Sequence, residues 1–170
     1  MKIERLEQYQ EEQRQEALGL ALRVFMAFEA PDYNDEGFAN FSEFVANREK
    51  TDPLAMYGAY QDGKLVGMGA TRNGGRHICL LFVDKAYHGQ GIGRRLVETM
   101  KRKCPDPMIT VNSSPYAVEI YKKMGFVPTD IELTHDGIRY TPMQCERQHH
   151  LGTVSIAQRQ KLLCMGRRFK

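Results

Sequence analysis

One segment constrains the fold of this chain more than any other: an uninterrupted apolar run that leads into a glycine-rich loop and then into a helix. Residues 77–83 read His-Ile-Cys-Leu-Leu-Phe-Val, which is typical of a central strand buried on both faces of a sheet. Glycine then occupies every second position over 89–93, and the apolar spacing over 96–100 predicts a helix that ends near Lys103. Such a strand–loop–helix unit is expected in a sheet covered by helices.

The glycine-rich loop has the chemistry of an anion site. Glycines have no Cβ, so that neighbouring backbone N–H groups can converge on an anion. The N-terminus of the following helix adds unpaired N–H donors and the positive end of the helix dipole. Arg94 and Arg95 stand in its first turn, where a cation is unfavourable unless an anion binds nearby. We therefore expect a diphosphate here, with a tight turn that binds nothing as the alternative.

Two familiar nucleotide-binding patterns do not fit this loop. A dinucleotide-binding loop has the spacing Gly-x-Gly-x-x-Gly on the first strand of a βαβ unit. The spacing here is Gly-x-Gly-x-Gly, and three strands and two helices are expected before the strand that leads into the loop. A P-loop ends in Gly-Lys-Ser/Thr, and that sequence does not follow here. Both nucleotide-binding patterns are therefore poor fits to this loop.

The other periodicities predict a mixed sheet with helices packed on it. The expected elements are a strand over 1–6, helices over 11–28 and 36–48, strands over 54–61, 64–72 and 77–83, the helix after the glycine loop, a strand over 108–112, a helix over 114–124, and strands over 129–134 and 138–143. This order, β-α-α-β-β-β-α-β-α-β-β, belongs to the α/β or α+β class.

Composition and charge exclude several function classes. A chain of 170 residues is the size of one domain. Residues 146–170 hold six of the 24 Lys and Arg but one of the 21 Asp and Glu, so that the rest of the chain is slightly acidic and nucleic acid is not an expected partner. The sequence shows no apolar run long enough for a membrane span and no signal-peptide core, which favours a cytoplasmic protein without a membrane partner.

The cysteines and the C-terminal residues complete the domain organisation. The four cysteines, Cys79, Cys104, Cys145 and Cys164, form no Cys-x-x-Cys pair, so we expect neither a metal site nor a disulfide framework. We predict one domain over 1–144 and a basic C-terminal extension over 145–170. The extension could add a helix, pack on a neighbouring subunit in a homodimer, bind acidic surfaces or remain frayed.

Two motifs resemble those of the GCN5-related N-acetyltransferase (GNAT) superfamily, small bacterial type. Residues 88–96, His-Gly-Gln-Gly-Ile-Gly-Arg-Arg-Leu, are similar to the acetyl-CoA-binding motif Gln/Arg-x-x-Gly-x-Gly/Ala, with His88 in place of Gln or Arg. Residues 112–126 begin with Asn-Ser-Ser-Pro-Tyr-Ala and end with Ile-Tyr-Lys-Lys-Met-Gly-Phe, which is similar to the family's segment Asn-x-x-Ala followed by Phe/Tyr-Tyr-x-x-x-Gly-Phe. Residues 137–143 are typical of small bacterial members. The resemblance covers about 1–144.

The resemblance implies a splayed central sheet and a binding mode for acetyl-CoA. The strand that ends at Val83 and the strand that begins at Met108 would part, and the pantetheine arm would enter the gap. There the main chain of Phe82 and Val83 would bind pantetheine like an added strand. The residues expected at the cofactor are Phe82, Val83, His88, Gly89, Gln90, Gly91, Ile92, Gly93, Arg94, Asn112 and Tyr121.

The implied activity is direct transfer of an acetyl group from acetyl-CoA to a primary amine of a small molecule or peptide, in a ternary complex. Tyr121 stands at the position of the family's acid tyrosine, and a phenol, protonated at neutral pH, can donate to the departing thiolate; otherwise it is a core tyrosine. His77 is a candidate base, since imidazole ordinarily titrates near 6.5, and otherwise an ordinary strand residue. Cys79 could act covalently, although a small core residue fits it better.

The acceptor side is the least determined part of the site. The resemblance places Tyr33, Glu36 and Phe38 there, together with Phe28, Phe41 and the loop near 134–139. Tyr33 and Glu36 are further candidates for the base, and a water chain to bulk solvent is another route for the proton. The amine stays open among an amino acid, a polyamine, an aminoglycoside-like drug and a peptide N-terminus. A different function, a non-catalytic acyl-CoA-binding sensor of the same fold, is also open, but Tyr121 at the acid position favours an enzyme.

Overall fold

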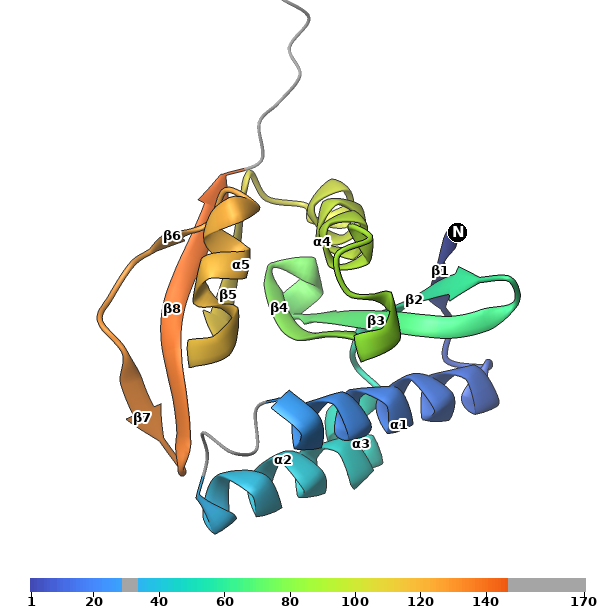
Figure 1. Cartoon of the computed structure of the whole chain (residues 1–170), viewed down its shortest axis with the longest axis horizontal. Coiled ribbons are helices and arrows are strands. Elements are labelled where there is room, and N and C mark those ends of the chain that lie inside the picture. The colour runs from blue at the N-terminus through green and yellow to red at the C-terminus, as the bar shows by residue number, and fades with distance from the viewer. Residues whose placement is uncertain (29–33, 147–170) are drawn as a thin grey trace, which may run out of the picture.

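The computed structural model describes residues 1–28 and 34–146, and it consists of a single mixed sheet with helices on both faces. Its elements are β1 (Lys2–Leu6), α1 (Glu11–Phe28), α2 (Asp35–Ala46), α3 (Arg48–Thr51), β2 (Ala55–Gln61), β3 (Lys64–Arg72), β4 (His77–Val83), α4 (Ile92–Lys103), β5 (Met108–Ser113), α5 (Val118–Lys123), β6 (Val127–Pro128), β7 (Leu133–His135) and β8 (Ile138–Glu146), with short 3₁₀ turns at Asn73–Gly75, Lys85–Tyr87 and Pro115–Ala117. The mixed α+β class expected from the sequence is confirmed (Figure 1).

The sheet has the strand order β1-β2-β3-β4-β5-β8-β6, and β7 pairs with β8 beside this path. β4 and β5 are parallel to each other, whereas the other neighbouring strands are antiparallel. Figure 1 shows α1 and α2 on one side of the sheet and α4 on the other. Among the described helices, none has both the length and the apolar character that a membrane span requires.

Each face of the sheet buries a separate apolar cluster. On one face α1 packs through Ala17, Leu18, Leu20, Ala21 and Phe25. On the other, α4 packs through Ile92, Leu96, Val97 and Met100. The close approach of α4 to β3 depends on glycine, since a Cβ at Gly69 would lie 2.9 Å from the Met100 Cε and one at Gly67 3.1 Å from the Ile92 Cγ2.

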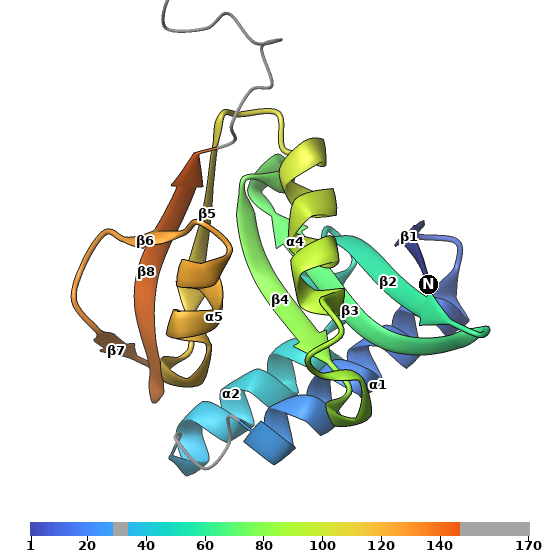
Figure 2. The same cartoon turned by 45° about the horizontal axis from the view of Figure 1, so that its top comes forward.

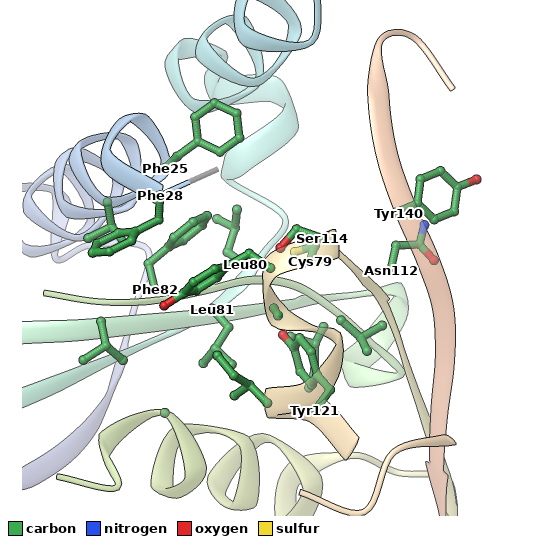
Figure 3. A pocket seen from close by; sticks show the side chains of 18 of the residues that line it. Phe25, Phe28, Cys79, Leu80, Leu81, Phe82, Asn112, Ser114, Tyr121 and Tyr140 are labelled. Carbon is green, nitrogen blue, oxygen red and sulfur yellow. The ribbon is translucent and has the colours of Figure 1, made fainter. Parts of the chain in front are cut away.

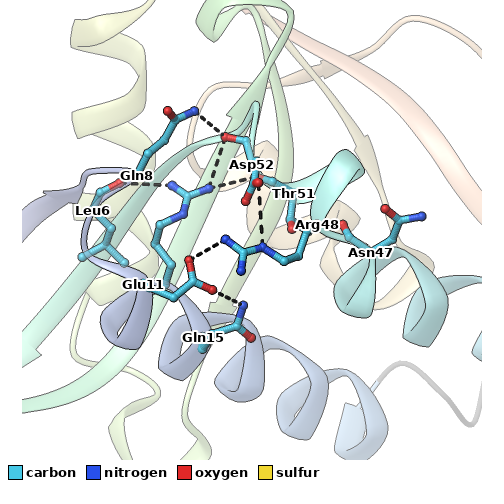
Figure 4. A network of polar contacts seen from close by, with 9 residues as sticks. Leu6, Gln8, Glu11, Gln15, Asn47, Arg48, Thr51 and Asp52 are labelled. Carbon is cyan, nitrogen blue, oxygen red and sulfur yellow. Dashed lines mark hydrogen bonds and ion pairs between the residues drawn. The ribbon is translucent and has the colours of Figure 1, made fainter.

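The start of α1 is fixed by a buried arginine. Arg14 is 4% exposed, and its guanidinium donates to the backbone carbonyls of Leu6 (3.2 Å), Thr51 (2.9 Å), Asp52 (3.4 Å) and Leu54 (3.5 Å). Figure 4 shows these carbonyl-bearing segments converging, with the Arg48–Glu11 ion pair beside them. The buried charge is thus satisfied by four backbone carbonyls, and it joins β1, α1 and α3.

Several element boundaries differ from the sequence prediction, and the larger differences have physical reasons. The helix expected over 36–48 ends at Ala46, because Asn47 takes an extended conformation and its side chain accepts from the Lys50 N–H to begin α3. The helix expected over 114–124 divides into a 3₁₀ turn and α5, and Ser114 makes no side-chain cap.

The C-terminal strands also differ. The strand expected over 129–134 is replaced by the short strands β6 and β7. β8 continues to Glu146, where Cys145 and Glu146 pair with Ile109 and Met108, so that both belong to the sheet rather than to the predicted extension. The rest of that extension, 147–170, lies outside the described residues.

β4 was expected to be buried on both faces, and this is wrong. Ile78, Leu80 and Phe82 are buried, but the residues between them are half-buried. The reason is that the half-buried residues line a cleft, which leaves part of their surface open.

Candidate active site

The site begins where two parallel strands separate. β4 and β5 pair at two positions, His77 with Thr110 and Ile78 with Val111. Beyond them β4 continues along β3, and β5 continues along β8. Figure 2 shows the two strands diverging from their paired ends. The splayed sheet that the family resemblance implied is confirmed, and among residues 1–28 and 34–146 no strand pairs with the β4 edge that faces β5 after Ile78.

A cleft of about 990 Å³ occupies this gap, at the upper end of the usual size of ligand pockets. It extends from the glycine loop along β4 to α2, α3 and the β7–β8 turn. Figure 3 shows side chains from β4, α5, β5 and α1 around it. The residues expected at the cofactor that line it are Phe82, Val83, His88, Gly89, Gly91, Ile92, Gly93, Arg94, Asn112 and Tyr121. Gln90 is exposed and does not line it.

The glycine loop leaves the start of α4 open to a ligand. Gly89 and Gly91 both have a φ of +75°, which favours glycine, and Gly91 caps α4 without a side-chain hydrogen bond. No atom lies within 4 Å of a Cβ built at either residue. The first turn of α4 contains no acidic residue. These features fit a diphosphate, because unpaired N–H donors and the positive end of the helix dipole meet in open space.

Hydrogen bonds and ring contacts connect the elements around the glycine loop. The His88 Nε2 lies 2.8 Å from the Val83 carbonyl oxygen, and the ring is 5.2 Å from that of Phe28 at the end of α1. Phe28 also stacks on Tyr116, at 5.7 Å. The Arg94 guanidinium donates to the Lys123 carbonyl (2.8 Å), so that its side chain joins α4 to α5 across the narrow side of the cleft.

Tyr121 and Ser114 are polar groups on the β5 side of the cleft. Tyr121 is 5% exposed, and its ring meets Phe126 edge to face at 5.2 Å. Figure 3 shows it among the side chains that line the cleft. Ser114 is also buried, and within the described part of the chain its hydroxyl has no hydrogen-bond partner. The sequence analysis missed Ser114 as a lining residue, although its place beside Pro115 at a strand end was visible.

Burial changes the chemistry of His77 and Cys79. The His77 Nδ1 lies 2.8 Å from the Thr110 Oγ1. Burial, with a smaller contribution from Arg72, lowers the pKa of His77 to about 4, so that the ring is neutral and weakly basic at neutral pH. Burial raises the pKa of Cys79 to about 11, which keeps the thiol protonated and disfavours a covalent cysteine route.

The acceptor end differs from the sequence prediction. Phe38 stacks on Phe25 at a ring distance of 6.5 Å, and Glu36 is exposed in the first turn of α2; neither lines the cleft. The reason is the helical period of α2, which turns Asn40 and Glu43 toward the cleft instead. Tyr33 lies outside the described residues.

Other residues at this end were missed. They are Lys50 after α2, Arg72 at the end of β3, and Tyr140 on β8. The β7–β8 turn, which the sequence analysis did assign to the acceptor side, lines the cleft through His135, Asp136 and Ile138. The Asn40 side chain donates to the Asp136 carbonyl (2.9 Å), so that α2 contacts this turn over the cleft.

Comparison with known proteins decides the family. The family model described as "Acetyltransferase (GNAT) domain" matches residues 29–147. The chain belongs to this GNAT family. The GNAT membership predicted from the two sequence motifs is thereby confirmed.

Individual GNAT proteins resemble the chain to different degrees. It is 45% identical over 92 residues to the peptidyl-lysine N-acetyltransferase YjaB of Salmonella typhimurium, a match that spans 54% of this chain and 61% of that protein. A GCN5-related N-acetyltransferase structure from Rhodopseudomonas palustris has a TM-score of 0.72 at 20% identity and covers 85% of this chain and 94% of its own. The PaiA N-acetyltransferase of Thermoplasma acidophilum, solved with coenzyme A, has a TM-score of 0.60 at 18% identity, with 86% and 99% covered. The two solved structures, at 20% and 18% identity, show that the chain shares their fold.

Proposed function

We propose that this chain is an N-acetyltransferase that transfers an acetyl group from acetyl-CoA directly to a primary amine in a ternary complex. The observation that carries the proposal is the unpaired edge of β4, which runs between the uncapped N-terminus of α4 and the buried Tyr121. This arrangement supports the binding of a long ligand with a diphosphate at one end and a reactive group at the other. The GNAT family and the coenzyme A complex of a protein with the same fold agree with it.

The chain's own groups suit each part of acetyl-CoA. Backbone N–H groups from Gly89 to Arg94 would hold the diphosphate. The main chain of β4 after Ile78 would bind the pantetheine arm as a neighbouring strand does, with Asn112 on the opposite strand. Acetyl-CoA supplies an activated thioester, so that correct positioning of the amine accounts for much of the rate.

Tyr121 is our candidate for the proton donor to the departing sulfur. It lies on α5, on the side of the cleft opposite β4, and lines the cleft. We assign His77 to positioning rather than to proton abstraction, because a group with a pKa of about 4 is a poor base toward an ammonium that ordinarily titrates near 10.4. The amine proton would then pass through water at the open mouth of the cleft to hydroxide or a buffer base in bulk solvent.

Release of the CoA thiol from acetyl-CoA, measured with a panel of primary amines and a lysine peptide, tests the function. We expect turnover with at least one amine and a strong loss in Tyr121→Phe. Tight binding of acetyl-CoA with no turnover across the panel would contradict the enzyme and favour a sensor. The Salmonella relative is named a peptidyl-lysine N-acetyltransferase, so that a lysine side chain belongs in the panel. A cytoplasmic location and a homodimer stay predictions.

A further inference from the structure

Charged side chains gather at the end of the cleft that lies away from the glycine loop. Glu43 from α2, Lys50 from α3, Arg72 from β3 and Asp136 from the β7–β8 turn all line it. Three of these groups have a polar partner. The Lys50 Nζ lies 2.5 Å from a Glu43 carboxylate oxygen, and the His135 Nδ1 lies 2.9 Å from the Asp136 carboxylate.

Arg72 differs from its neighbours because its charge is unmatched. Within residues 1–28 and 34–146 its exposed guanidinium has neither an ion-pair nor a hydrogen-bond partner. The nearby Arg76 is also exposed but pairs with Asp106, and it does not line the cleft. A cation that faces a ligand cleft without a partner is available to an anionic group of the ligand.

The strand register places Arg72 at a useful distance from the reaction. Arg72 is the cross-strand partner of His77, and β4 and β5 separate after Ile78. At about 3.3 Å per residue, the splay at Cys79 and Leu80 lies roughly 7–10 Å along the strand from the Arg72–His77 pair. An anion held by Arg72 would therefore be separated by several bonds from an amine that attacks at the splay.

His77 does not compete for this anion. It lies directly opposite Arg72, but burial and the arginine keep it neutral at neutral pH. The arginine lowers the pKa of His77 and partly offsets the rise that burial causes in the pKa of Cys79, which agrees with a guanidinium positioned over the cleft rather than turned away.

We propose that Arg72 binds a carboxylate of the acceptor, so that the preferred acceptors are primary amines that carry a carboxylate several bonds from the reacting nitrogen. This inference rests on the proposed acetyltransferase function and specifies its acceptor class. Free lysine has this chemistry, and so does a lysine side chain next to an acidic residue in a peptide. Arg72 is a specificity-determining residue in this assignment, and Tyr121 and the glycine loop are unaffected by it.

A matched pair of acceptors tests the assignment, because lysine and cadaverine differ by the carboxylate alone. We expect kcat/KM of the wild-type protein to be about 10- to 100-fold higher for lysine, the range of a charge-assisted hydrogen-bonded pair. Arg72→Gln should remove most of this preference through KM, Arg72→Lys should restore part of it, and Arg76→Gln should keep it. A lysine peptide flanked by Glu, compared with the same peptide flanked by Gln, distinguishes a peptide acceptor from a free amino acid.

A second measurement does not depend on turnover. The imidazole of His77, followed by NMR in the CoA-bound protein, should show a rise in pKa when lysine is added, since a carboxylate at Arg72 offsets the charge that helps to depress it. Cadaverine should give no rise, and Arg72→Gln should abolish the response to lysine.

The inference is overturned if lysine and cadaverine, and the two peptides, are used equally well by the wild-type protein. It is also overturned if lysine and the Glu-flanked peptide both leave the His77 pKa unchanged. Acetylation of cadaverine in either case would leave the proposed function standing. Failure to bind acetyl-CoA at all would instead remove the proposed function.

Discussion

Two arginines show how differently this fold treats the same charge. Arg14 is buried at the start of α1, and four backbone carbonyls satisfy its guanidinium. Arg72 is exposed at the end of β3, faces the cleft, and within the described residues has no partner. The first joins segments of the chain to one another, whereas the second is left for a ligand. The part of the chain around Arg14 is therefore complete without a substrate, and the cleft is not.

Two buried tyrosines differ in the same way, since one lines the cleft and the other lies in the core. We expect the largest effect on kcat when the tyrosine at the cleft is replaced. Tyr121→Phe, at the cleft, should lower kcat by about 100- to 10,000-fold, the usual contribution of a positioned acid. Tyr57→Phe, in the core away from the cleft, should leave kcat nearly unchanged. Steady-state kinetics with acetyl-CoA in excess measures both, and a similar small loss in the two variants would end the proton-donor role.

Replacement of the two arginines should separate stability from activity. Arg14→Met should lower the free energy of unfolding by about 3 kcal/mol, because it removes the buried hydrogen bonds of the guanidinium to four backbone carbonyls, and should leave kcat of the folded protein unchanged. Arg72→Met should change the free energy of unfolding by less than about 0.5 kcal/mol. Urea unfolding measures both. Equal losses of stability would show that Arg72 is structural as well.

Stability should also depend on pH through His77, which lies between the packed sheet and the cleft. Its pKa is about 4 in the folded chain and ordinarily 6.5, so that the unfolded chain binds more protons between these values. Stability is thus fully present above pH 6.5 and is lost as the pH falls toward 4, by about 2 kcal/mol after allowance for partial exposure.

The control for this pH dependence is His77→Gln, which should flatten the slope between pH 6.5 and 4 when unfolding is followed at each pH. Carboxylates elsewhere contribute to acid unfolding in both proteins. If the variant and the parent lose stability in parallel over this range, His77 is not the group responsible.

Two glycines of the loop give the smallest expected change in stability. Gly91→Ala should destabilise the chain by about 1 kcal/mol, since an alanine is strained at a φ of +75°. Gly93 lies inside α4, where a Cβ would meet its nearest atoms at 3.8 Å, so Gly93→Ala should stabilise it by about 0.5 kcal/mol or more. Thermal unfolding of the two variants without ligand checks the difference in sign.

The sequence predicted best what depends on neighbouring residues. The bounds of α1, β3 and β4 and the glycine loop follow from local apolar spacing and from residues that permit a positive φ. The splay, by contrast, came from a family resemblance, because no local pattern says where two parallel strands stop pairing.

What the sequence did not predict depends on contacts between distant segments. Arg14 donates hydrogen bonds to Thr51 and Asp52, which lie 37 and 38 residues away in the sequence, and no pattern within α1 predicts a buried cation. The acceptor residues were missed for a related reason. Glu36 and Phe38 fit a helix near the site, but the rotation of α2 on the sheet decides which of its side chains reach the cleft.

A structure determined with coenzyme A bound tests the central claim most directly. We predict the diphosphate at the backbone N–H groups of Gly89 to Arg94 and the pantetheine arm along the free edge of β4, with its sulfur near Tyr121. Coenzyme A seated at another surface, or absent from well-folded protein soaked at millimolar concentration, would contradict this account of the cleft.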